Sequence, residues 1–139
     1  MKIAFHIDEG ALVLPDGAVD RSMNLLEWKI DGDPVQLTVQ RDTHADRLSP
    51  AKLLAVTTSE YERRFPLFQS ETAPALEIAR DHAVAAFTWK KDHQAVYQAQ
   101  VFIELGSRVL VLTASGRAKH RDAIVALIQG AVESMTVRT

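Results

Sequence analysis

The chain has 139 residues, of which 47% are apolar and 24% charged, and its formal net charge is −2. These values suit one compact domain over residues 1–139 and exclude a disordered or repetitive chain. Charges of both signs are interspersed, so no basic field favours nucleic acid as a partner, and the lack of cysteine excludes disulfides and thiolate metal sites.

The N-terminal residues do not have the pattern of a secretory signal. Polar side chains begin at His6 and continue at Asp8, which leaves no apolar segment of the length that a signal peptide requires. The apolar runs elsewhere, such as residues 109–114, are far shorter than the roughly 20 residues of a membrane-spanning helix. We therefore expect a soluble, cytoplasmic protein without direct membrane insertion.

The first part of the chain predicts two β-hairpins. Strands are expected at residues 3–7, 11–14, 22–30 and 35–41, with glycine-containing turns inside each hairpin. In the fourth strand Val35, Leu37 and Val39 share one face and polar residues occupy the other. One face of that strand should be buried.

A helix is predicted to follow, because Ser49 and Pro50 form a typical N-cap and first helical position. The helix should run to about Arg64, before Pro66 stops it. Its apolar stripe consists of Leu53 or Leu54, Thr57, Tyr61 and Phe65. Residues 67–71 then favour a short strand.

The second half predicts a meander and a final helix. Strands are expected at residues 84–90, 95–105 and 108–114, and an amphipathic helix at residues 119–132. Tight turns between consecutive strands require antiparallel pairing. The fold class is therefore α+β, a twisted antiparallel sheet with helices packed on one face.

Two strands have a second face that is partly apolar. Gln98, Gln100 and Phe102 share one side of the long strand, opposite a fully apolar side, and Met23 and Leu25 share one side of theirs. A soluble protein normally avoids large exposed apolar patches, so this face is a candidate binding surface. Spacing alone favours the alternative that Met23 and Leu25 are core and that the glutamines are ordinary solvent-facing strand residues.

The stretch from Glu9 to Trp28 adds a family resemblance. A glycine turn leads into a short apolar strand ending at Pro15, and an Asp-Arg-Ser step precedes the strand that contains Met23. This order resembles the DcrB-related family, which includes the Eag chaperones of type VI secretion. The resemblance implies a Mog1/PsbP-like fold. Since the DcrB branch is exported and lipid-anchored, whereas the Eag branch works in the cytoplasm, the lack of a signal favours the Eag branch.

The resemblance implies a chaperone or adaptor that shields hydrophobic transmembrane helices of a type VI secretion effector before loading and export. Its partners would be that effector and a second copy of the chain in a homodimer. The groove for the client would be lined by Met23, Leu25, Leu67, Gln98, Gln100 and Phe102. The alternative is a Mog1-like interaction domain that binds a folded protein partner.

No motif favours an enzyme. The pairs Asp81-His82 and Asp92-His93 lack the spacing of a metal or triad signature, and surface or turn histidines explain them better. We expect no catalytic residues, no metal and no cofactor.

Overall fold

We describe a computed structural model of the chain. The structure describes residues 2–7, 10–15, 23–42, 48–106 and 108–135. Its elements, in chain order, are β1 (Lys2–Ile7), β2 (Gly10–Pro15), β3 (Asn24–Ile30), β4 (Asp33–Asp42), α1 (Pro50–Arg64), β5 (Gln69–Glu71), β6 (His82–Lys91), β7 (Gln94–Leu105), β8 (Arg108–Arg117), the 3₁₀ turn η1 (Ala118–His120) and α2 (Arg121–Glu133).

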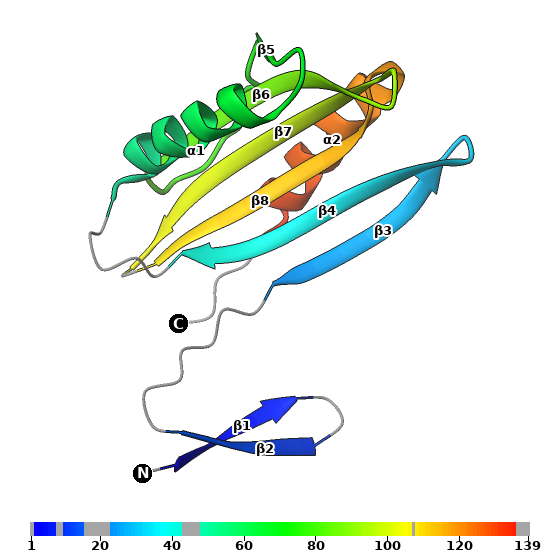
Figure 1. Cartoon of the computed structure of the whole chain (residues 1–139). Coiled ribbons are helices and arrows are strands. Elements are labelled where there is room, and N and C mark those ends of the chain that lie inside the picture. The colour runs from blue at the N-terminus through cyan, green and yellow to red at the C-terminus, as the bar shows by residue number, and fades with distance from the viewer. Residues whose placement is uncertain (1, 8–9, 16–22, 43–47, 107, 136–139) are drawn as a thin grey trace.

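Every strand pairing is antiparallel, as the short turns predict. β1 and β2 form a two-stranded hairpin, and the six other strands form one sheet in the order β3-β4-β8-β7-β6-β5 (Figure 1). The turn between β3 and β4 contains Asp31 and Gly32 at φ values of 50° and 83°. Positive φ at both central residues matches the two-residue turn whose twist suits a hairpin.

The predicted helix α1 has the predicted boundaries. The Ser49 hydroxyl accepts a hydrogen bond from the Lys52 N–H at 3.3 Å, and Pro50 occupies the first turn, where it loses no hydrogen bond. At the other end the Phe65 N–H donates to the Tyr61 carbonyl at 2.8 Å. The residues after Pro66 form the short strand β5 only from Gln69 onward.

The two helices lie on opposite faces of the sheet (Figure 1). Leu53 of α1 packs with Phe102, Val109 and Val111, whereas α2 packs on the other side of β7 and β8. The α2 side is the larger core, and its fully buried members on β7 and α2 are Tyr97, Ala99, Val101, Ile103, Ile124 and Ile128.

The α+β class and the twisted antiparallel sheet are confirmed, but the expectation that both helices cover one face is wrong. The physical reason lies in β7 and β8, which carry apolar side chains on both sides, so each face can bury a helix. α1 lies over β6 and β7. Among the described elements, no helix lies over β3 and β4 on that side.

Candidate functional site

Strand register brings most of the predicted groove residues to the same face of the sheet. Partners in antiparallel strands share a face, so one row runs from Leu25 through Thr38 and Thr113 to Gln100. Gln98 lies in the next row. We call the α1-side surface of β3 and β4 the open half-face, because α1 covers only the other half.

Met23 and Leu25 are exposed on the open half-face. Met23 is 53% and Leu25 55% exposed, which excludes the core alternative for both residues in the described structure. The Gln40 amide donates to the Met23 sulfur at 3.1 Å, which holds this thioether beside the end of β4. Leu26 is 51% exposed but lies on the opposite face of β3, beside Leu37. Leu26 therefore matches Leu25 in residue type and exposure but lies outside the open half-face.

The two glutamines differ in what they can still bind. Gln100 is 2% exposed, and its amide group donates to the Tyr61 hydroxyl at 3.2 Å and the Thr113 hydroxyl at 2.9 Å. Its carbonyl oxygen Oε1 has no partner in the described part of the chain. Gln98 is half-buried, and its carbonyl oxygen accepts from Trp89 Nε1 at 3.4 Å. Within the described ranges its NH₂ group has no partner, so Gln98 is the glutamine that can contact a ligand.

Two predicted groove residues lie elsewhere. Phe102 is 1% exposed beneath α1, and we assign it to the core in place of the groove. Phe102 does lie on the same face of the sheet as Leu25, but α1 covers β7 at that point. Leu67 is 73% exposed in the turn before β5, at the opposite edge of the sheet from β3, so it does not join Met23 and Leu25.

Aromatic rings beside Gln98 form a feature that the groove prediction did not include. Tyr61 and Phe65 stack at 4.8 Å between ring centroids, and Phe65 stacks on Trp89 at 4.4 Å. Each such pair contributes about 0.5–1.5 kcal/mol beyond area burial. The four-residue spacing of Tyr61 and Phe65 was visible in the sequence, but the position of Trp89 against them requires the fold. This stack packs α1 against β6.

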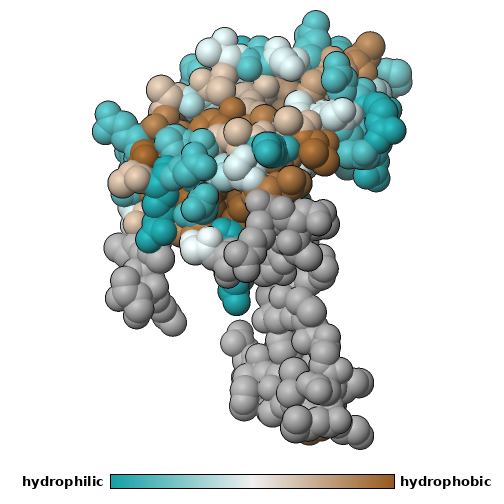
Figure 2. Space-filling model, turned by 90° about the vertical axis from the view of Figure 1, so that its left-hand side faces the viewer, coloured by the Kyte–Doolittle hydropathy of each residue, from teal (hydrophilic) through white to brown (hydrophobic). Residues whose placement is uncertain are grey.

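Seen from the side that lies to the left in Figure 1, apolar residues in brown lie between polar residues in teal (Figure 2). The described surface on this side is therefore mixed.

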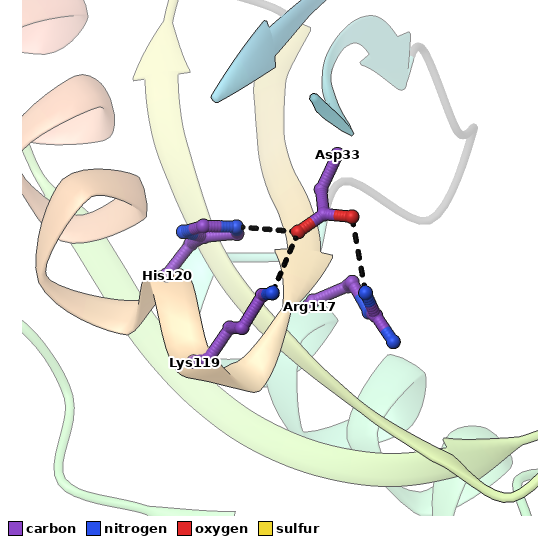
Figure 3. Close-up of polar contacts among 4 residues, drawn as sticks. All are labelled: Asp33, Arg117, Lys119 and His120. Atoms are coloured by element: carbon purple, nitrogen blue, oxygen red, sulfur yellow. Dashed lines mark hydrogen bonds and ion pairs between the residues drawn. The ribbon is translucent and has the colours of Figure 1, made fainter. Parts of the chain in front are cut away.

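A cluster of charged side chains fixes the turn from which β3 and β4 emerge. The Asp33 carboxylate accepts from Arg117 at 3.0 Å, from Lys119 at 3.1 Å and from the His120 ring nitrogen Nε2 at 2.8 Å (Figure 3). His120 is 8% exposed and precedes α2, so the cluster ties the β3–β4 turn to the start of α2. These hydrogen bonds, from His120 first and then Lys119 and Arg117, hold the pKa of Asp33 well below its usual range.

Asp33→Asn is expected to lower the melting temperature at about pH 7, and the difference from wild type should shrink below about pH 4. A carboxyl whose folded pKa is depressed contributes stability above its unfolded pKa. That contribution is lost as the pH falls toward the folded value. Circular dichroism melts of both proteins between about pH 7 and pH 3 measure the difference. A difference that stays constant over this range would contradict the role given to the charged Asp33.

None of the helices in the described part of the chain has the length and apolar character needed to cross a membrane.

Comparisons with known proteins agree with the fold. A family model described as DcrB matches residues 9–134. PA94 of Pseudomonas aeruginosa, described as a protein of unknown function and candidate regulator, superposes with a TM-score of 0.76 at 18% identity, covering 99% of this chain and 98% of that chain. LpqN of Mycobacterium tuberculosis, described as involved in cell envelope biogenesis, gives 0.56 at 17% identity, covering 100% of this chain and 91% of that chain. No curated protein matches the sequence.

Proposed function

Because the chain belongs to the DcrB family, we propose that it is a chaperone or adaptor that binds an apolar helix of a client protein on the open half-face. The observation that carries the proposal is the exposure of Met23 and Leu25, at 53% and 55%, on strands that α1 leaves uncovered. The finer proposal is that the client is a type VI secretion effector. Its N-terminal transmembrane helices would be shielded in the cytoplasm before loading and export.

The residue types suit such a client. An apolar helix of roughly 20 residues must be kept from water until it reaches a membrane. Met23 adapts to irregular partners and Leu25 supplies apolar area. The NH₂ group of Gln98 can donate to a polar group or exposed carbonyl on the helix, which contributes on the order of 1 kcal/mol.

Some polar residues of the open half-face already have partners within the chain. Gln36 donates to Glu27 at 3.0 Å, and the Gln40 amide donates to the Met23 sulfur at 3.1 Å. Charges held in this way need not be stripped of all their partners when an apolar surface docks beside them. The open half-face can therefore accept an apolar helix without leaving these groups unpaired.

The proposal includes a homodimer. One sheet face contacts a helix from one side only, and two copies can enclose what one cannot. Loading of the type VI secretion effector would then begin when its helix is released from the open half-faces of the two copies. The runner-up function, an interaction domain for a folded partner, needs neither a second copy nor an apolar helix.

Light scattering combined with size-exclusion chromatography tests both the homodimer and the binding of an apolar helix. At tens of micromolar protein, roughly the range of a weak specific contact, the mass should be about twice the 15.4 kDa of one chain. A fluorescent apolar helical peptide, flanked by lysines for solubility, should elute with that dimer. A monomer would contradict the dimer, and a peptide that elutes alone would contradict the chaperone. Co-elution of a folded partner without the peptide would favour the runner-up.

A further inference from the structure

A hollow of about 530 Å³ lies at the β5–β6 edge of the sheet, at the far end of the strand order from β3. Leu67, Phe68 and Trp89 supply apolar groups to its lining. Lys90 and Arg121 also line it and carry positive charge. Since β3 and β5 are the two outer strands, this hollow is separate from the open half-face.

Leu67 takes a strained backbone conformation to reach this position. Its φ is +54°, in the left-handed region that glycine adopts freely and a bulky side chain adopts at a cost. Its side chain is also 73% exposed, so it gains little from packing within the chain. The strain at Leu67 therefore costs the folded state free energy that packing of this exposed side chain does not offset. Strained residues of this kind gather at ligand sites.

The charges at the hollow are unbalanced. Arg121 donates to Glu71 at 3.2 Å and lies 5.2 Å from the centre of the Tyr97 ring, so its guanidinium is held in place. In the part of the chain that the structure describes, no carboxylate pairs with Lys90. Two cations therefore face one carboxylate, and the hollow can accept one more negative charge.

We infer that this hollow binds a short segment of a partner protein in which an apolar side chain adjoins a carboxylate. The apolar side chain packs on Leu67 and Phe68, and the carboxylate pairs with Lys90. The volume holds a few side chains and not a long helix. The site is thus a second contact, distinct in chemistry from the apolar helix proposed for the open half-face, and it does not depend on that proposal.

The test is selection of random eight-residue peptides displayed on phage against the full chain, followed by anisotropy titrations of the enriched peptides. They should carry Asp or Glu beside a large apolar residue. Lys90→Glu and Leu67→Asn should each weaken binding by about tenfold or more. Asn tolerates the positive φ, so Leu67→Asn tests the side chain and not the turn.

Lys91→Glu is the matched control, because it makes the same charge change one residue along β6 on the opposite face and should bind like wild type. Leu25→Glu should also leave this binding unchanged, which separates the two surfaces. The inference would be overturned if no such peptide is enriched. It would also be overturned if Lys90→Glu and Leu67→Asn bind the enriched peptides as tightly as wild type does. Leu67→Gly should melt at or above the wild-type temperature, and a clear fall would show that Leu67 is retained for packing.

Discussion

Leu25→Glu is expected to leave a folded protein that no longer binds an apolar helix. Leu25 is 55% exposed, so the new carboxylate stays in water when no client is bound. Docking of an apolar helix would bury that carboxylate without a partner, at a cost of several kcal/mol. Circular dichroism melts test folding, and anisotropy of the labelled apolar peptide tests binding.

Leu26→Glu is the control for this variant. Leu26 is 51% exposed and adjacent in sequence, but its side chain lies on the other face of β3. It should fold and bind the peptide like wild type. If Leu25→Glu fails to fold, Leu25 belongs to a buried surface and the open half-face is not a docking site. If Leu25→Glu binds as tightly as wild type, the helix docks elsewhere.

Phe102→Ala is expected to lower the free energy of unfolding by about 3–5 kcal/mol, as large-to-small core substitutions do. Phe102 is 1% exposed and packs with Leu53, Val109 and Val111 beneath α1. The cavity would loosen α1 on the sheet. Urea unfolding measures the loss, and Leu25→Ala, at an exposed position, should stay within about 0.5 kcal/mol of wild type.

A loss below about 1 kcal/mol for Phe102→Ala would show that the site is not a packed core. In that case Phe102 would return to the groove in which the family resemblance places it. The stability losses of Leu25→Ala and Phe102→Ala together therefore distinguish the exposed half of this face of the sheet from the half that α1 covers.

Local patterns in the sequence predicted the elements well. Alternation identified Val35 and Leu37 as core, where they are 0% and 7% exposed, and Ser49 and Pro50 marked the start of α1. The two-residue period of a strand also predicted that Met23 and Leu25 share one side of their strand and that Gln98 and Gln100 share one side of β7. These features depend on neighbours along the chain or across one hairpin.

The placement of the helices could not be predicted in the same way. β7 is apolar at Val101 and also at Phe102, so its pattern is compatible with a helix on either face. Only the observed position of α1 decides that Gln100 is buried and that Leu25 is not. The Asp33 cluster could not be predicted from the sequence either, because Arg117 and His120 lie 84 and 87 residues further along the chain.

The most direct measurement of the central claim is photo-crosslinking from single positions. The chain contains no cysteine, so Leu25→Cys and Leu26→Cys each give one site for a benzophenone label. The two positions are similarly exposed and lie on opposite faces of β3. We expect the labelled Leu25→Cys protein to crosslink to the apolar helical peptide and the labelled Leu26→Cys protein to give little product. Equal yields from the two positions, or product from Leu26→Cys alone, would contradict the assignment of the client to the open half-face.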